Sequence, residues 1–230
     1  METSTIQRFK NRASELLESR LIKTGRLLDV RHWENAALTE IDLHLPEAAM
    51  EFWADVPYIK LKIAAFTYRD YTPFAWDAET HTCSLLIDTA HVGPGSLWAK
   101  SIQPGETIQY LGIDSSRQSP HPTDLVVGIG DASSLAHLLA LQQLTLPRTR
   151  FDGAVLLQNS IQKELFSAYF QSPLVPISDE QELTSWLQAQ EYCINHTQFY
   201  LTGNHHLVGR LRRSLKAIGY KQIKHKGFWS

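Results

Sequence analysis

The chain has 230 residues, of which 43% are hydrophobic and 20% are charged. This composition is typical of a folded protein with one large core or two moderate ones, and it excludes a disordered chain. The formal net charge is −2, with acidic and basic residues mixed along the chain, so the sequence lacks the broad basic surface that a nucleic-acid partner requires.

The N-terminal region predicts an amphipathic helix rather than a targeting segment. From about Ser4 to Leu21, apolar residues recur at helical spacing with polar residues between them. These apolar residues are Ile6, Phe9, Ala13, Leu16, Leu17 and Leu21. The region lacks the basic-then-apolar order of a signal peptide, and no run elsewhere is long enough to cross a bilayer. We therefore expect a cytoplasmic protein.

Residues 23–110 predict a domain built from strands. Short segments with strand character follow one another here without long helices between them. The clearest segments are 27–31, 38–45, 58–63 and 83–87. Closely spaced strands of this kind favour an antiparallel barrel or a sandwich. Residues 115–123 are then rich in turn residues and almost free of apolar ones, which predicts a linker, with one domain over 1–118 and a second over 119–230.

Beyond this linker, apolar runs alternate with helical patterns. Residues 125–130 and 153–157 are continuous apolar runs, and residues 133–144 between them have helical periodicity. The pattern continues with an expected helix over 179–190, a strand over 198–202 and a helix over 205–218. Such alternation indicates a parallel sheet covered on both faces. The predicted fold class is therefore α+β with two domains, an N-terminal antiparallel β-barrel followed by an α/β parallel-sheet domain.

The segment Arg69-Asp70-Tyr71-Thr72 is the first candidate binding element. On a strand, Arg69 and Tyr71 point to the same face, where a guanidinium can pair with a phosphate while a phenol packs flat against a ring system. The Thr72 hydroxyl can then reach the edge of that ring. The alternative is an ordinary strand with an arginine that extends to solvent and a tyrosine that packs in the core.

A turn that opens a helix follows about twenty residues later. His91 precedes Gly93-Pro94-Gly95-Ser96, and the free N–H groups at such a helix start suit a pyrophosphate. The alternative is an ordinary helix cap with proline in the first turn and Trp98 in the core.

Two strand-to-helix junctions in the second half form a further candidate site. Residues 128–134 follow an apolar run, at the end of a parallel strand where ligands bind in open α/β sheets. Ser133 stands where a dinucleotide-binding Gly-x-Gly-x-x-Gly motif has its third glycine, so the motif is incomplete. Thr202 and Gly203 end a later strand and are expected to form the opposite wall of the same crevice.

Basic residues alternate in two places where they can share one face of a strand. These residues are Lys60 and Lys62 in the first half, and Lys224 and Lys226 near the end of the chain. They are candidates for binding an anionic substrate, and solvated strand faces are the alternative.

The cysteines and histidines predict no metal site. Cys83 and Cys193 have no Cys-x-x-Cys spacing, so we expect two buried thiols and neither a disulfide framework nor a structural zinc. His205, His206 and His225 share no ligand spacing with carboxylates or thiols, which favours surface or packing roles.

Taken in order, these motifs are similar to those of the siderophore-interacting proteins, flavin-dependent ferric-siderophore reductases of the ferredoxin-reductase-like superfamily. The motifs that carry the resemblance are Arg-x-Tyr-Thr at 69–72, His91 with Gly-Pro-Gly-Ser-x-Trp-Ala at 93–99, Pro-Gly-Glu at 104–106, Gly-Asp at 130–131, Gly203, Leu-Arg-Arg-Ser-Leu at 211–215, and Lys-Gly-Phe-Trp at 226–229. The resemblance implies a barrel that holds FAD and an α/β domain that brings NADPH or NADH to it.

The resemblance also implies roles for individual residues. Arg69 would hold a flavin phosphate, and Tyr71 and Thr72 would contact the isoalloxazine as the catalytic pair. The remaining cofactor contacts would be His91, Gly95 and Ser96 at the flavin phosphates, Gly130, Asp131, Ser133, Thr202 and Gly203 at the nicotinamide nucleotide, and Trp229 in a tail that packs toward the flavin. Lys163 or Arg210 could meet a 2′-phosphate, which tilts the expected electron donor toward NADPH.

The implied reaction carries electrons from NAD(P)H through FAD to a ferric siderophore and releases Fe(II). The partner would be a small iron chelate, the protein would need no metal ligands, and we expect a monomer. One alternative is a flavin reductase with another acceptor, such as ferredoxin, a quinone or free flavin. Another is a non-catalytic flavin- or siderophore-binding protein, which the unusual turns after Gly130 and Gly203 would suit.

Overall fold

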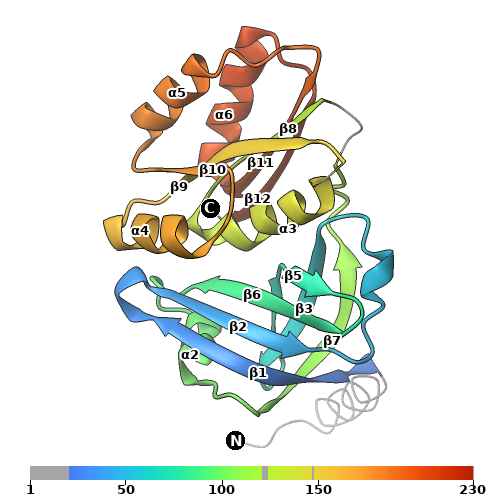
Figure 1. Ribbon diagram of the computed structural model, residues 1–230. Helices are drawn as coiled ribbons and strands as arrows, with labels where there is room; N and C mark the ends of the chain where they lie inside the picture. Colours follow the sequence, from blue (N-terminus) through green and yellow to red (C-terminus); the bar gives the residue numbers. More distant parts are fainter. Residues whose placement is uncertain (1–20, 121–123, 147, 230) are drawn as a thin grey trace, which may run out of the picture.

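The computed structural model describes residues 21–120, 124–146 and 148–229, and the chain forms two domains (Figure 1). The helix predicted from Ser4 lies outside the described residues, apart from Leu21 at its end. The side chains of Glu34 and Trp229 also lie outside the description.

The first domain is a seven-stranded antiparallel sheet. Its strands are β1 (Lys23–Trp33), β2 (Leu38–His44), β3 (Pro57–Ala64), β4 (Thr67–Tyr71), β5 (Phe74–Asp77), β6 (Thr82–Asp88) and β7 (Thr107–Ser115). The hydrogen-bonded order is β4-β3-β7-β1-β2-β6-β5. Strands β4 and β5 are at opposite ends of this order, yet only Thr72 and Pro73 separate them in the chain. The sheet must therefore curl until its edges meet, which confirms the predicted antiparallel barrel.

Short helices and alternating apolar residues complete the barrel. The helical elements are η1 (Glu34–Ala36), η2 (Met50–Phe52) and α2 (Pro94–Ser101). Along β2 and its partner β6, Ile41, Leu43 and Leu85 are fully buried, as the period of two in a half-buried strand requires. Ala99 of α2 joins this core and holds the helix against the barrel.

The second domain is a five-stranded parallel sheet with helices on both faces. Its elements are β8 (Leu125–Asp131), η3 (Ala132–Ser134), α3 (Leu135–Thr145), β9 (Arg150–Leu156), α4 (Ser160–Tyr169), β10 (Leu174–Ile177), α5 (Glu180–Ala189), β11 (Thr197–Asn204), α6 (His205–Ile218) and β12 (Ile223–Trp229). The strand order is β10-β9-β8-β11-β12. Val127 and Ile129 of β8 pack toward α5 and α6, whereas Val126 packs toward α3 and α4. This arrangement confirms the predicted parallel sheet.

Two elements of the second domain were not predicted. Helix α4 was missed although Ile161, Leu165, Phe166 and Tyr169 recur at helical spacing, and it buries Gln162 and Phe166. Strand β10 has four residues and contains Pro176, which removes a backbone donor and places the strand at an edge of the sheet.

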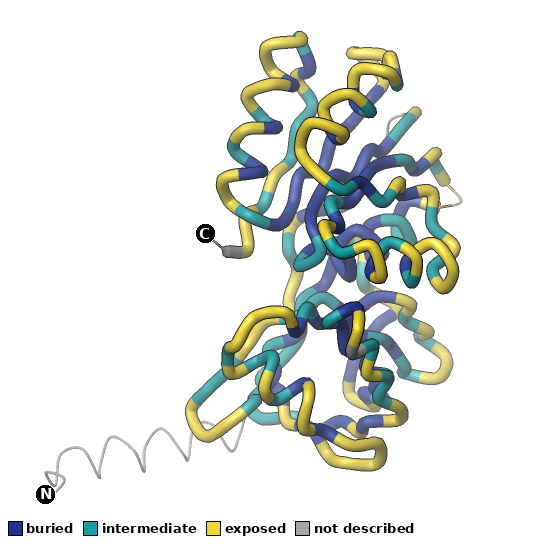
Figure 2. Tube along the Cα trace, turned by 90° about the vertical axis from the view of Figure 1, so that its left-hand side faces the viewer, coloured by how far each residue is buried: buried dark blue, intermediate teal, exposed yellow. Residues whose placement is uncertain are grey.

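The two domains share a buried interface. Helices α3 and α4 lie between the parallel sheet and the barrel, whereas α5 and α6 cover the other face of the sheet (Figure 1). Phe74 and Leu86 of the barrel belong to the same buried cluster as Leu135 and Leu139 of α3. Figure 2 shows buried residues on both sides of this junction. The domains are therefore packed together and do not depend on the linker alone.

The segment predicted as a linker is bonded to both domains. The Ser116 amide donates to the Val56 carbonyl over 2.9 Å, and the Val56 amide donates to the Gln118 carbonyl over 3.0 Å. One residue later, the Ser119 carbonyl accepts from the Tyr200 hydroxyl and from the Lys224 ammonium of the second domain. The boundary at residue 118 stays a prediction, and it falls inside this doubly anchored segment.

The cysteine prediction is correct for one residue and wrong for the other. Cys83 is buried in the barrel, but Cys193 is exposed because it lies in the connection between α5 and β11 rather than in either element. Among the described residues no cluster of histidine, cysteine, aspartate and glutamate could hold a metal ion. In that same part of the chain, no helix is long and apolar enough to span a membrane.

Candidate functional site

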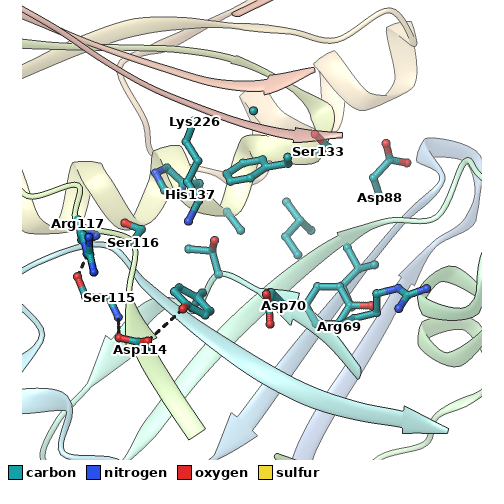
Figure 3. Close-up of a pocket in the computed structure, with 18 residues that line it drawn as sticks. Arg69, Asp70, Asp88, Asp114, Ser115, Ser116, Arg117, Ser133, His137 and Lys226 are labelled. Carbon is teal, nitrogen blue, oxygen red and sulfur yellow. Dashed lines mark hydrogen bonds between the residues drawn. The ribbon is translucent and has the colours of Figure 1, made fainter. Parts of the chain in front are cut away.

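A cleft of about 760 Å³ lies where the barrel meets the second domain (Figure 3). Its volume is within the range of small-molecule sites. The barrel contributes Tyr58, residues 69–72, residues 86–88 and residues 114–117, and the second domain contributes Ser133, Ala136, His137 and residues 226–228. Three of the residues singled out by the Arg-x-Tyr-Thr motif therefore share one wall.

Arg69 and Tyr71 are held on β4, a strand at the edge of the sheet. The ring of Tyr71 stacks on Trp98, with centroids 6.1 Å apart and an interplanar angle of 22°. Burial raises the pKa of Tyr71 to about 12, so the phenol stays protonated at neutral pH. The guanidinium of Arg69 donates to the Tyr68 carbonyl over 2.8 Å and forms no ion pair with a described residue. This wall therefore offers an aromatic ring and a cation to a ligand.

The start of α2 fits closely against this pair. A Cβ atom on Gly95 would overlap the Tyr71 hydroxyl and would come within 3.7 Å of the Arg69 side chain. Only glycine lets the backbone approach so near, which brings the unsatisfied N–H groups of the first helical turn beside Arg69. Ser96 lies in this turn, and its hydroxyl donates to the Asp88 carbonyl over 3.4 Å. Arg69 and the α2 N-terminus together form a cradle with the chemistry of a phosphate site.

His91 lies outside the cleft lining. It is exposed in the segment between β6 and α2, and no lining residue comes from that segment after Asp88. Its predicted role beside the cofactor stays a prediction.

Behind the opposite wall, the Asp131 carboxylate accepts hydrogen bonds from other residues of the protein. Oδ1 accepts from the Ser133 amide at 3.1 Å and hydroxyl at 2.6 Å, and Oδ2 accepts from the Asn204 amide at 2.6 Å. Gly203 has a φ of 110°, and a Cβ there would come within 2.5 Å of the Asp131 carboxylate. These contacts connect the ends of the neighbouring strands β8 and β11.

Gly130 and Thr202, the other predicted residues at these strand ends, are also closely packed by their neighbours. A Cβ on Gly130 would overlap the Ser134 hydroxyl and lie 2.9 Å from the Thr202 carbonyl oxygen. Thr202 is completely buried, and its hydroxyl has no hydrogen-bond partner among the described residues. Of the five predicted contacts on this wall, only Ser133 lines the cleft, and the other four shape the strand ends behind it.

His137 lines the cleft and was not predicted. Its side chain is 2% exposed, and its Nε2 donates to Gln118 Oε1 over 2.6 Å. Burial, together with the charge of Lys226, lowers the pKa of His137 to about 3, so the ring is neutral. Its neighbours in α3 are leucines and alanines, so the sequence suggests only a buried helix. The useful signal would have been a single imidazole within that apolar run.

The C-terminal strand closes the cleft with a lysine between two rings. Lys226 Nζ lies 5.1 Å from the ring centroid of Tyr58 and 6.0 Å from that of Phe228. Burial lowers the pKa of Lys226, and the nearby Asp70 and Asp114 carboxylates oppose this effect. Figure 3 shows Lys226 and His137 on one side of the cleft and Asp70 and Asp114 on the other. Trp229 follows in β12, with its side chain outside the described residues.

The structure brings only one of the four predicted substrate lysines to the cleft. Lys60 Nζ donates to Asp70 Oδ1 over 2.6 Å across the β3–β4 pair. Lys224 donates to the Ser119 carbonyl over 3.1 Å and lies 5.4 Å from the Tyr200 ring centroid. Lys62 also lies on β3 and is not among the lining residues. Lys226 is therefore the member of this set that a ligand in the cleft can meet.

Lys163 and Arg210, the candidates for a 2′-phosphate, have protein partners. Lys163 Nζ donates to the Ser178 hydroxyl over 2.6 Å. Arg210 Nε donates to Glu180 Oε2 over 2.9 Å, and the same guanidinium makes a second bond to Oε1. A phosphate would have to compete with these contacts, so the expected preference for NADPH receives no support from them.

Comparison with known proteins identifies the fold. No family model and no curated protein matches the sequence. A siderophore-interacting protein from Acinetobacter baumannii is 14% identical, with 90% of both chains covered and a TM-score of 0.71. A siderophore utilization protein from T. fusca is 18% identical over 90% of this chain and 92% of its own, with a TM-score of 0.68. A ferredoxin NADP+ reductase from Neisseria gonorrhoeae, solved with FAD and NADP, is 13% identical over 90% and 98%, with a TM-score of 0.69.

These structures include the group that the sequence motifs resemble. At identities below 20% they share the fold with this chain, and the fold is the ferredoxin-reductase-like arrangement of a barrel followed by a parallel-sheet domain.

Proposed function

We propose that this protein is a flavin-dependent reductase that takes electrons from NAD(P)H and delivers them to ferric siderophores. The observation that carries the proposal is the cleft itself. It has a cation and a ring on the barrel wall, opposite Ser133 just after the carboxyl end of β8, and the first turn of α2 packs against both of these side chains. A neighbour of the same fold was solved with FAD and NADP bound.

The barrel residues fit a flavin dinucleotide. Arg69 and the N–H groups near Gly95 and Ser96 would hold its phosphates, because an unpaired guanidinium and a helix start both favour negative charge. Tyr71 would pack beside the ring system, with Trp98 fixing its orientation. Thr72, directly after β4, would donate to the ring edge. A bound flavin accepts two electrons as a hydride and can pass them on singly.

The second domain would present the nicotinamide nucleotide. Ser133 lines the cleft at the end of β8, while Gly130, Asp131, Thr202 and Gly203 keep the ends of β8 and β11 in contact. In this proposal Ser133 touches the nucleotide and the other four residues position that edge. His137 is neutral and contributes no charge to the nucleotide beside it.

The substrate side of the proposal follows from iron chemistry. One NAD(P)H supplies two electrons and releases one proton, and two Fe(III) chelates become two Fe(II) chelates. Hard oxygen donors hold Fe(III) more tightly than Fe(II), so reduction loosens the metal without breaking the chelator.

Three measurements on the purified protein test this function in sequence. We expect a yellow protein with a flavin spectrum, bleaching of that spectrum by NADPH or NADH without oxygen, and recovery of the oxidised spectrum when a ferric siderophore is added. A colourless protein that takes up neither FAD nor FMN would contradict the flavin assignment. A flavin that NAD(P)H does not bleach would favour a non-catalytic binding protein. Bleaching without recovery on ferric chelates would point to another acceptor.

A further inference from the structure

The charged residues of the cleft indicate which class of iron chelate it takes, given the reductase function proposed above. Three cations line the cleft, Arg69, Arg117 and Lys226, and so do three carboxylates, Asp70, Asp88 and Asp114. The cleft is therefore not a cationic pocket, although the lysines of the sequence suggested one.

Two carboxylates across the cleft act on Lys226, the lysine that a substrate would meet. Asp70 and Asp114 both lie close enough to Lys226 to raise its pKa against the effect of burial. Asp114 accepts from the Tyr58 hydroxyl over 3.1 Å and from the Ser115 amide over 2.7 Å, and these bonds lower its pKa, so it is ionised at neutral pH. Two carboxylates therefore act on the charge of Lys226 before any ligand arrives.

The remaining charges leave no surplus of cations. Arg69 belongs to the phosphate cradle beside α2. Arg117 lies near Asp114 and lowers the pKa of that carboxyl. Asp70 is paired with Lys60, and Asp88 at the end of β6 binds the amide of Ala90 in its own turn over 2.9 Å. Among the described residues that line the cleft, three cations face three carboxylates, and one of these cations, Arg69, is committed to the phosphate cradle.

Ferric chelates fall into classes with different charges. A hydroxamate group carries one negative charge, so three of them around Fe(III) give a neutral complex. A catecholate group carries two, so three give a complex of charge −3. A trianion would lose water and then face carboxylates without a compensating excess of cations, which is unfavourable. A neutral chelate loses little hydration on entering the same space.

We propose that the cleft selects neutral ferric trihydroxamates over trianionic ferric tricatecholates. The rings of Tyr58 and Phe228, both near Lys226 Nζ, support this choice because they offer apolar surface to the methylene chains between hydroxamate groups. Phe228 is 39% exposed, so part of its ring is available for such a contact.

Binding of gallium chelates to the flavin-loaded protein tests the proposal. Ga(III) has the charge of Fe(III) but is not reduced, so affinity is measured apart from the different reduction potentials of the two chelate classes. The probes are the Ga(III) complexes of a linear trihydroxamate and of a hexadentate tricatecholate, titrated by quenching of protein fluorescence and checked by calorimetry. We expect the trihydroxamate to bind at least tenfold more tightly, with little dependence on salt. Equal or tighter binding of the tricatecholate would overturn the proposal.

A matched pair of variants identifies the cause. Removing one carboxylate from the cleft with Asp88→Asn should tighten tricatecholate binding about threefold to tenfold and change trihydroxamate binding less than twofold. Glu51→Gln removes the same charge from an exposed position on η2, away from the cleft, and should change neither affinity. An unchanged tricatecholate affinity in Asp88→Asn would contradict the electrostatic selection.

The outcomes separate this inference from the reductase function. If both complexes bind and the order is reversed, the substrate class is wrong while the reductase function stands. If neither complex binds and ferric chelates do not reoxidise the bleached flavin, the siderophore function fails together with the inference.

Discussion

The two walls of the cleft differ in what their polar groups do. On the barrel wall, Arg69 and the start of α2 keep groups available for a ligand. On the second-domain wall, Asp131 accepts three hydrogen bonds from its own protein, and Thr202 is fully buried. In the function proposed above, the barrel would hold the flavin through direct contacts, whereas the second domain would offer a preformed edge with few ligand contacts. We therefore expect tight flavin binding and weaker, exchangeable nicotinamide binding.

The largest expected effect tests the barrel wall. The double substitution Arg69→Ala and Tyr71→Ala removes the cation and the ring together, and we expect flavin affinity to fall more than a hundredfold. The ratio of flavin to protein absorbance after gel filtration measures this, and circular dichroism checks that the variant is folded. Arg213→Ala on α6, away from the cleft, should keep the full flavin content. A yellow double variant would show that the cofactor is not held by this wall.

The second-largest effect concerns His137 on the other wall. The folded pKa of about 3 is below the unfolded value of about 6.5, so the unfolded state binds the extra proton between these values. The associated stability is fully present above pH 6.5 and is lost as pH falls toward 3. Between pH 7.5 and pH 5 the loss from this group is about 2 kcal/mol. We expect the free energy of unfolding, measured with urea at pH 7.5 and pH 5, to fall by about 2 kcal/mol less in His137→Gln than in the parent.

An exposed histidine supplies the comparison for this measurement. His206→Gln, on the surface of α6, should lose as much stability on acidification as the parent does. Equal acid sensitivity of the parent and His137→Gln would mean that the ring is not kept neutral by burial.

A smaller effect separates the two glycines at the start of α2. Gly95→Ala should weaken flavin binding about tenfold, because the added Cβ must displace the Tyr71 hydroxyl. Gly93→Ala is its matched control, since a Cβ at that position meets nothing within 4 Å. Flavin titration of the apoprotein compares the two. Similar affinities would show that the contact between α2 and Tyr71 does not shape the cradle.

The smallest effect sharpens the assignment of Asp131 as a positioning residue. Asp131→Asn replaces a carboxylate oxygen by an N–H group that faces the Asn204 amide, and we expect a loss of about 1 kcal/mol in the free energy of unfolding. Flavin content should stay unchanged while the KM for NAD(P)H rises. Chemical denaturation and steady-state kinetics provide the two readouts. A loss of flavin instead would place Asp131 in the cradle of the other wall.

The fold was predictable where the chain uses local patterns. Alternating apolar residues identified β2, β3 and β6, and continuous apolar runs identified β8 and β9, because a strand buried on one or both faces shows this directly in its sequence. Helix α4 was missed although its apolar residues recur at helical spacing, whereas strand β10, with four residues and a proline, is too short to show a pattern. Cys193 was predicted to be buried, but it lies exposed in a connecting segment, and no pattern in the neighbouring sequence indicates this exposure.

The candidate site also contains residues that the local sequence predicts and residues that only the folded structure brings together. Arg69 and Tyr71 are two residues apart on β4, so the strand period predicts their common wall, and Thr72 follows directly after the strand. His137, Lys226 and Phe228 meet only because the folded domain brings α3, on one face of the second sheet, beside the end of β12. The internal bonds of Asp131 depend on the pairing of β8 with β11, which becomes visible only when the parallel sheet has formed.

The anchored segment between the domains has a consequence for kinetics. Gln118 bonds to His137, and Ser119 accepts from Tyr200 and Lys224, so both sides of the opening are attached to the same few residues. These bonds oppose an independent rotation of the two halves. In the proposed reductase, donor and acceptor would then occupy the opening by turns, and initial velocities at several fixed donor concentrations should give parallel double-reciprocal lines.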